Sequence, residues 1–119
     1  MTLEQIYQFF QNQPLEFLSQ ELAVCYVMSV LLQGDSYGTE LINRIESEYQ
    51  NYRLSDTVLY SGLSFLESEQ VISSYWKKAG GRGRPRRMYQ LEPQLLLQGQ
   101  KLAELWQNYK VTEATPKLV

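Results

Sequence analysis

Apolar residues recur at helical spacing along most of this chain, and glycine, proline or serine marks the points where the pattern breaks. Residues 2–12 carry apolar side chains at i, i+3, i+4 and i+7, the stripe of an amphipathic helix: Leu3, Ile6, Tyr7 and Phe10. After a break predicted at residues 13–14, a second helix is expected over residues 15–33 or 19–33. It is apolar almost all round, which indicates a helix buried at the centre of a domain. Gly34 is expected to end it in a left-handed cap.

Two further helices are predicted before residue 70. Residues 37–49 place three aliphatic side chains inward: Leu41, Ile42 and Ile45. Residues 55–69 form the fourth helix, with Ser55 as its N-cap and leucines 59, 63 and 66 on its inner face. Its outer face carries hydroxyl groups instead of the usual Glu and Lys: Thr57, Tyr60, Ser61, Ser64 and Ser68. Hydroxyl groups can donate to phosphates and base edges without repelling DNA, so this face favours a DNA contact over plain exposure to solvent.

The chain then changes to a strand pattern. Residues 71–78 and 86–91 predict two strands, joined by a loop over residues 79–85 that contains three glycines. The apolar pair at the start of the first strand, Val71-Ile72, should close the core. Trp76 and Tyr89 should brace the hairpin by packing across its strands.

A last helix is predicted over residues 93–109, followed by a frayed tail over residues 111–119. Its apolar residues follow a heptad-like spacing and form a wide stripe. Such a stripe suits an ordinary core, but together with the apolar first helix it favours a dimer surface. The candidate dimerisation residues are Leu3, Ile6, Tyr7, Phe10, Leu95, Leu102, Leu105, Trp106 and Tyr109.

These elements predict a mainly α protein with a small β-hairpin, a winged helix-turn-helix with one added helix at each end. A length of 119 residues suits one such domain. We expect an N-terminal dimerisation helix over residues 1–14 and a DNA-binding domain over 15–92. A C-terminal dimerisation helix over 93–110 and the tail over 111–119 complete the predicted organisation.

The charge distribution points to nucleic acid as the partner of the hairpin. The net charge is −2, yet six of the eleven Lys and Arg residues lie between Lys77 and Arg87, and residues 71–91 contain no Asp or Glu. The hairpin therefore carries +6 and the rest of the chain −8, and local potential follows the distribution and not the average. Residues 82–85, Arg-Gly-Arg-Pro, resemble the centre of an AT-hook, which enters a narrow A/T-rich minor groove. A wing that contacts only phosphates explains them equally well.

The composition argues against an enzyme and against a metal site. The chain has no histidine and a single cysteine, Cys25, so the commonest general base and the usual transition-metal ligands are missing. Cys25 lies in an apolar helix and is expected to be a buried structural thiol. We expect no cofactor and no metal. Without a long apolar run or a secretory signal, we expect a cytoplasmic protein that does not enter a membrane.

Three sequence runs resemble those of PadR-type transcriptional regulators. Residues 34–42, Gly-Asp-Ser-Tyr-Gly-Thr-Glu-Leu-Ile, are similar to the family's Gly-x-x-x-Gly-Tyr-Glu-Leu run. Residues 59–67 resemble its Leu-Tyr-Pro-Ala-Leu-x-x-Leu-Glu recognition helix, and residues 86–91 match its second wing strand. The resemblance covers residues 15–92. It departs from the pattern at four places: Ser61 stands for a proline, Thr57-Val58 for Gly-Thr, Gln70 for a helix-ending glycine, and Phe65 for a residue that is often polar.

The resemblance implies a homodimeric repressor that binds an inverted-repeat operator. The helix over residues 55–69 would lie in the major groove and supply specificity, and the wing over residues 77–87 would lie on the minor groove or the DNA backbone. The candidate DNA-binding residues are Thr57, Tyr60, Ser61, Ser64, Lys77, Lys78, Arg82, Arg84, Arg86 and Arg87.

Two further expectations stay open beside this one. The resemblance also implies a possible effector, since members of the family often sense phenolic or multidrug ligands in aromatic pockets between subunits. Four aromatic residues are candidates for such a pocket, although packing in the dimer is the simpler explanation: Tyr7, Phe10, Trp76 and Trp106. No effector can be named. The alternative function is a protein-interaction module on a winged-helix scaffold with little or no DNA binding, which Phe65 and the acidic remainder of the chain favour.

Overall fold

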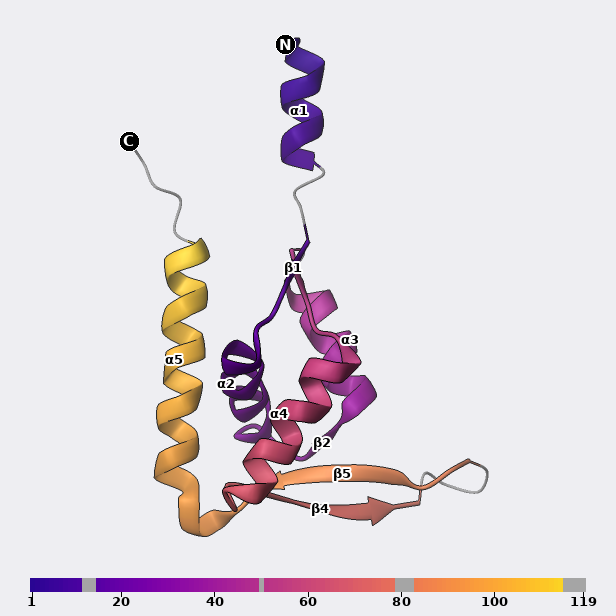
Figure 1. Ribbon diagram of the computed structural model, residues 1–119, viewed down its shortest axis with the longest axis vertical. Helices are drawn as coiled ribbons and strands as arrows, with labels where there is room; N and C mark the ends of the chain where they lie inside the picture. Colours follow the sequence, from indigo (N-terminus) through magenta and orange to yellow (C-terminus); the bar gives the residue numbers. More distant parts are fainter. Residues whose placement is uncertain (12–14, 50, 79–82, 115–119) are drawn as a thin grey trace.

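The computed structural model describes residues 1–11, 15–49, 51–78 and 83–114, with the side chains of 9–11 and 110–114 left aside. Within these ranges the protein has five α-helices, one 3-10 turn and five short strands (Figure 1). The helices are α1 Leu3–Gln11, α2 Gln20–Leu31, α3 Gly38–Glu48, α4 Asp56–Ser68 and α5 Leu96–Ala114, with the 3-10 turn η1 at Pro93–Leu95. The predicted fold, mainly helical with a β-hairpin, is confirmed.

Helix α2 lies at the centre of the molecule, between α4 and α5. Every side chain from Ala23 to Leu31 is buried, as the all-round apolar pattern predicts. The one phenol in this stretch, Tyr26, donates a hydrogen bond of 2.7 Å to the carbonyl oxygen of Leu41 on α3. Burial raises the pKa of Tyr26, so its hydroxyl stays a donor at every physiological pH.

Helix α2 begins at Gln20, because Ser19 caps it by accepting a hydrogen bond of 3.3 Å from the backbone of Leu22. The alternative start at residue 15 is wrong. Glu16–Phe17 instead forms a short strand, β1, which pairs in parallel with β3, Tyr52–Arg53. The first turn of a helix leaves backbone N–H groups without hydrogen-bond partners, whereas the pairing of β1 with β3 provides partners for backbone groups here.

The ends of two helices differ from the expectation at their glycine positions. Gly34 does not take a left-handed conformation, because α2 already ends in a right-handed turn at Leu32. At the end of α4, by contrast, Gln70 has a φ of 61°. A left-handed conformation is unfavourable for a residue with a Cβ. Gln70 therefore occupies, under strain, a position that favours glycine.

The wing is built on a three-stranded antiparallel sheet in the order β2-β5-β4. Strands β4, Ile72–Lys77, and β5, Arg86–Leu91, confirm the predicted hairpin, while β2, Ser36–Tyr37, was not predicted. Val71 and Ile72 are buried, as is Tyr89. Trp76 does not pack as predicted and is 69% exposed.

The C-terminal helix packs on the protein's own core. Trp106 on α5 is only 1% exposed, with its ring 5.5 Å from Tyr26, edge to face, and 6.1 Å from Tyr109, stacked. Leu95, Leu102 and Tyr109 also pack against this core. Trp106 is therefore not available to a second subunit, which corrects the prediction for that residue. For the partly buried Leu95, Leu102 and Tyr109, a role in a dimer stays a prediction. The helix also continues past residue 109 to Ala114, and residues 115–119 lie outside the described part.

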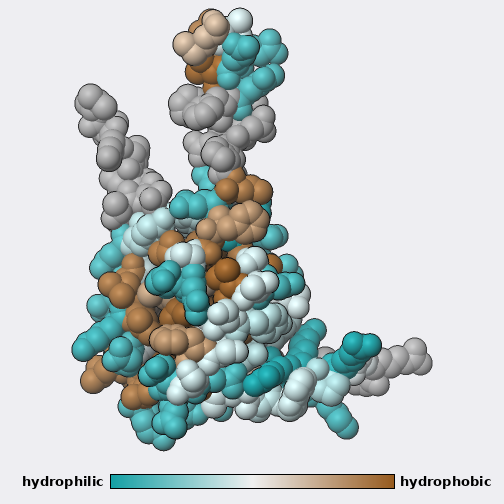
Figure 2. Space-filling view, in the orientation of Figure 1, coloured by the Kyte–Doolittle hydropathy of each residue, from teal (hydrophilic) through white to brown (hydrophobic). Residues whose placement is uncertain are grey.

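Helix α1 stands apart from the rest of the molecule (Figure 1). Thr2 and Gln5 begin it with a reciprocal capping box, in which each side chain accepts a hydrogen bond from the other's backbone N–H. Its apolar side chains gather on one side, opposite the polar ones (Figure 2), and Leu3 and Tyr7 are 73% and 65% exposed. The break predicted at residues 13–14 lies outside the described residues. No helix of the described part is long and apolar enough to cross a membrane.

The left-handed Gln70 predicts a stabilising substitution. Gln70→Gly should raise the free energy of unfolding by about 0.5–1 kcal/mol. Glycine removes most of the strain of the left-handed conformation, but it also loses more backbone entropy on folding, which offsets part of that gain. Chemical denaturation measures the change. Gln70→Ala is the matched control, since alanine shortens the side chain but keeps the Cβ. An equal gain from both variants would show that the backbone conformation is not the cause.

Candidate nucleic-acid interface

Helix α4 is held so that its hydroxyl-bearing face stays open to solvent. Ser55 caps it by accepting a hydrogen bond of 3.2 Å from the backbone N–H of Val58, as predicted. Leucines 59, 63 and 66 are buried, and Gly62 lets the helix approach Val24 of α2 closely. The opposite face is exposed throughout: Thr57, Tyr60, Ser61, Ser64 and Ser68. The predicted division into an inner and an outer face is confirmed.

Tyr60 is half-exposed, at 49%, and its hydroxyl rests against the first turn of α3. A Cβ placed on Gly38 would lie 2.3 Å from that hydroxyl oxygen, closer than any two such atoms can approach. The glycine at the start of α3 therefore leaves the space that the Tyr60 hydroxyl occupies. This relation was not predicted from the sequence, because Gly38 and Tyr60 lie on different helices.

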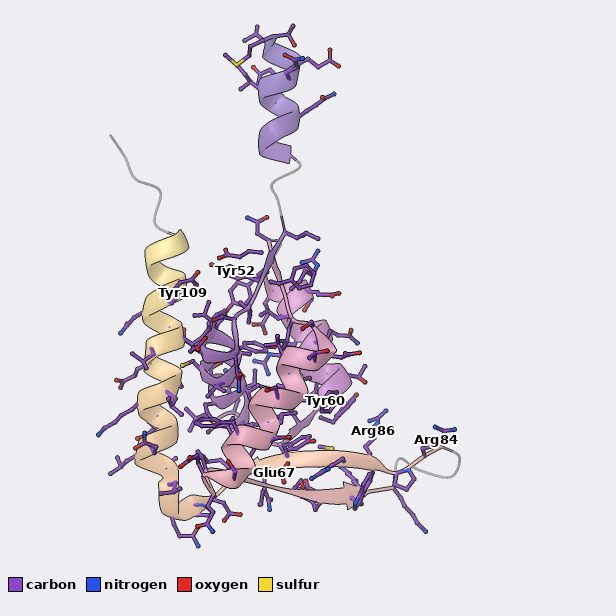
Figure 3. The ribbon with its side chains drawn as sticks, viewed as in Figure 1. Tyr52, Tyr60, Glu67, Arg84, Arg86 and Tyr109 are labelled. Carbon is purple, nitrogen blue, oxygen red and sulfur yellow. The ribbon has the colours of Figure 1, made fainter. Side chains whose placement is uncertain are left out.

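The wing presents its basic residues outward. Lys77, Lys78, Arg84 and Arg86 are exposed, and Arg82 lies outside the described residues. The guanidinium of Arg86 lies 4.4 Å from the ring centroid of Tyr37, in a cation–π contact. Among the described residues, no carboxylate comes within ion-pair distance of Arg84 or Arg86. Figure 3 shows Arg84 farther out along the wing than Arg86, with Tyr60 on the same side of the wing as Arg86.

Arg87 differs from its neighbours because it is already engaged inside the protein. One guanidinium nitrogen lies 3.2 Å from both carboxylate oxygens of Glu67 on α4, and Nε donates to the Ser74 hydroxyl at 3.1 Å. Its guanidinium also lies 5.6 Å from the centroid of the Tyr89 ring. These contacts join α4 to the wing. Arg87 is thus placed to hold the two elements in register, whereas the sequence assigned it to DNA with the other arginines.

A second contact ties the wing to the turn between α2 and α3. The Tyr75 hydroxyl donates a hydrogen bond of 2.6 Å to the Asp35 carboxylate, which raises the pKa of the phenol. Asp35 and Glu67 therefore hold the wing from two sides. Neither role was predicted, because a lone carboxylate in a sequence looks the same whether it is solvated or paired across the fold.

The other candidate chemistries find no support in the geometry. Among the described residues, no three His, Cys, Asp or Glu side chains are grouped to hold a metal ion. Cys25 is buried, as predicted, and burial raises the pKa of its thiol. The aromatic residues considered for a pocket lie apart within one chain, with Trp76 on the wing, Trp106 in the core and Tyr7 on α1. The side chain of Phe10 is not described.

Comparison with known proteins gives consistent matches. Residues 27–94 match the family model described as Transcriptional regulator PadR-like family. Over 97% of its length the chain is similar to the circadian clock associated protein Pex from Anabaena, with 57% identity, a TM-score of 0.85 and all of that chain covered. Pex from Synechococcus is 60% identical, with a TM-score of 0.83 and 92% and 98% of the two chains covered.

A more distant similarity connects the chain to a transcriptional regulator from Clostridium thermocellum. The identity is 27% and the TM-score 0.63, with 82% of this chain and 96% of the other covered. No curated protein matches the chain.

The contact between α4 and the wing predicts an energetic coupling. In a double-mutant cycle with Glu67→Gln and Arg87→Gln, the coupling should be about 0.3–1 kcal/mol, the range of a pair that is largely open to solvent. Urea denaturation measures it, and added salt should reduce it. Glu67→Gln combined with Lys101→Gln on α5 is the control and should be additive. Additivity in the first cycle as well would mean that the pair does not join α4 to the wing in solution.

Proposed function

Since this chain belongs to the PadR-like family of transcriptional regulators, we propose that it is a homodimeric repressor that binds an inverted-repeat operator in double-stranded DNA. Helix α4 enters the major groove, and the wing lies on the minor groove or the backbone beside it. One observation carries the proposal. A hairpin with a charge of +6, in a chain that is otherwise acidic, is joined through Glu67 and Arg87 to a helix whose open face carries hydroxyl groups.

Helix and wing divide the work of binding. Arg84, Arg86 and the lysines at the end of β4 are exposed and supply attraction to phosphates, which does not depend on sequence. The side chains that α4 offers to bases and phosphates are Thr57, Tyr60, Ser61 and Ser64. Because the wing is fixed to α4 and to the turn before α3, phosphate contacts made by the wing set the position of α4 in its groove.

The dimer depends on α1. A helix of nine residues is too short to persist alone in water, and Leu3 and Tyr7 of its apolar stripe stay exposed in the described part of the chain. A second copy supplies that cover. On α5, Leu97 and Leu105 are 74% and 59% exposed and provide apolar surface for the contact, in place of the residues that α5 buries in its own core. A two-fold dimer would then present two α4 helices to two half-sites.

A protein-interaction module is the second candidate function. Phe65 favours it, because its ring is 46% exposed on a flank of α4. The two functions differ in their response to salt. Binding to a DNA duplex through phosphates weakens steeply as salt rises, whereas an apolar protein contact does not.

The wing should supply affinity for any duplex. Arg82→Ala together with Arg84→Ala should weaken binding to all duplexes, and the slope of log K against log salt should become shallower by about 0.9 for each phosphate that the wing no longer binds. Fluorescence anisotropy of a labelled duplex, titrated at several salt concentrations, measures both quantities. Lys101→Ala, on α5 and away from the wing, is the control. Unchanged affinity and slope in the double variant would remove the wing from the interface.

The dimer should fail when the stripe of α1 becomes polar. Leu3→Ser with Tyr7→Ser should give the mass of a single chain in analytical ultracentrifugation, because both side chains are exposed and available only to a second copy. Gln8→Ser, on the polar side of the same helix, should leave the dimer intact. A dimer that survives removal of residues 1–13 would place the interface elsewhere.

A further inference from the structure

Trp76 is the most exposed aromatic side chain among the described residues. It lies on β4 opposite Arg87 in the antiparallel register and is 69% exposed, whereas Trp106, the only other tryptophan, is 1% exposed. A tryptophan that stays exposed to water does not contribute the stabilisation that burial of its ring would give. Arg87 lies directly across the strands from it, and Lys77 and Arg86 form the next pair toward the tip of the wing. Its position therefore suits a partner that offers an apolar surface together with negative charge.

A hollow of about 330 Å³ opens beside this ring, where α3, α4 and the wing meet. The residues that bear on its chemistry are Tyr37, Gly38, Thr39, Tyr60, Trp76 and Arg86. Two of its walls come from rings, Tyr60 on α4 and Trp76 on β4. Arg86 enters from β5, held over the ring of Tyr37. In Figure 3 this space lies between Tyr60 and Arg86, above the wing.

The charge of the hollow is positive and largely uncompensated. No Asp or Glu of the described residues lines it. Of its two arginines, Arg87 is neutralised by Glu67, whereas Arg86 lies over the Tyr37 ring and has no carboxylate within ion-pair distance among the described residues. The hydroxyl groups of Thr39 and Tyr60 add two hydrogen-bond donors. A guanidinium with two hydroxyl groups is a donor set for a phosphate oxygen, and an aromatic ring next to it suits the apolar face of a sugar.

We propose that this hollow seats one nucleotide unit of the DNA backbone. Its phosphate binds Arg86 and the hydroxyl groups of Thr39 and Tyr60, while its deoxyribose packs against Trp76. The inference rests on the proposed DNA-binding function and specifies a contact point between recognition helix and wing. Tyr60 then contacts the backbone, and base reading falls to Thr57, Ser61 and Ser64.

Gly38 is the positioning residue of this site. Because a Cβ at Gly38 would lie 2.3 Å from the Tyr60 hydroxyl oxygen and 3.0 Å from the ring carbon that bears it, any larger residue moves the phenol. Gly38→Ala should therefore weaken duplex binding through Tyr60 alone. In a Tyr60→Ala background, where the phenol is absent, the same substitution should have no effect on binding.

Tryptophan fluorescence tests the seat directly, since the chain has one exposed and one buried tryptophan. With an unlabelled mixed-sequence DNA duplex at low salt, the emission of the wild-type protein should be quenched and acrylamide should reach Trp76 less. Trp76→Phe should abolish both changes, because only the buried Trp106 then emits. Anisotropy of a labelled copy of the same duplex should show affinity on the order of tenfold weaker for Trp76→Ala with an unaltered salt slope. Trp76→Phe, which keeps a ring, should retain most of the affinity.

Three controls separate this site from general effects. Arg86→Gln should make the salt slope shallower by about 0.9, since it removes a phosphate contact. Phe17→Ala removes an exposed aromatic ring from β1, far from the wing, and should leave binding unchanged. Thermal melting identifies variants that fail to fold. Where a variant fails to fold, the fluorescence of the wild-type protein with DNA is the test of the proposed site.

The outcomes distinguish this inference from the function it rests on. Binding seen by anisotropy without any change in Trp76 emission or quenching would overturn the seat and leave DNA binding standing. An equal effect of Gly38→Ala in the presence and absence of the Tyr60 phenol would overturn the positioning role. If no duplex bound at any salt concentration, both the proposed function and the seat would fail.

Discussion

The burial of α2 from Ala23 to Leu31 is the constraint on which the rest of the structure depends. A helix stretch that is apolar on every side has to be covered on every side, and α4, α5 and β5 supply that cover, with Tyr26 hydrogen-bonded to α3. Because α2 needs this cover, the apolar stripe of α5, including Trp106, packs into the core of its own chain. It also fixes the line of α4, whose leucines face α2 and whose hydroxyl groups are therefore turned outward. The exposed face of α4 is thus a consequence of what the core requires.

The second level of organisation is polar. The wing leaves the body of the protein with few apolar contacts beyond Val71, Ile72 and Tyr89, so its position depends on directional bonds. Glu67 with Arg87, and Asp35 with Tyr75, hold it from two sides. A hairpin tied in this way moves with the helix beside it. The basic residues that form one cluster in the sequence therefore have two different roles. Arg84 and Arg86 are exposed to solvent, whereas Arg87 connects the wing to α4.

Much of the fold followed from the sequence because its signals were local. Helical periodicity located α1 to α5, Ser55 identified itself as a cap, and the hairpin strands followed the change of period. The family resemblance drawn from residues 34–42 and 59–67 is confirmed by the match over residues 27–94. What the sequence did not reveal depends on pairing across the fold. Trp106 turned inward because Tyr26, Tyr49 and Tyr52 meet there, β1 formed because β3 lies beside it, and Gly38 matters only because Tyr60 reaches it. Periodicity cannot tell whether an apolar stripe faces its own core or another subunit.

The wing projects away from the rest of the molecule, and the charges of the two parts are opposite in sign (Figure 1). In the field of a polyanion such a molecule behaves as an electric dipole, drawn in wing first and pushed back at its acidic body. Approaches in other orientations are repelled before contact, so a larger share of collisions arrives in a productive orientation. For the DNA partner proposed above, the orientation of the protein in solution is therefore the first step of binding.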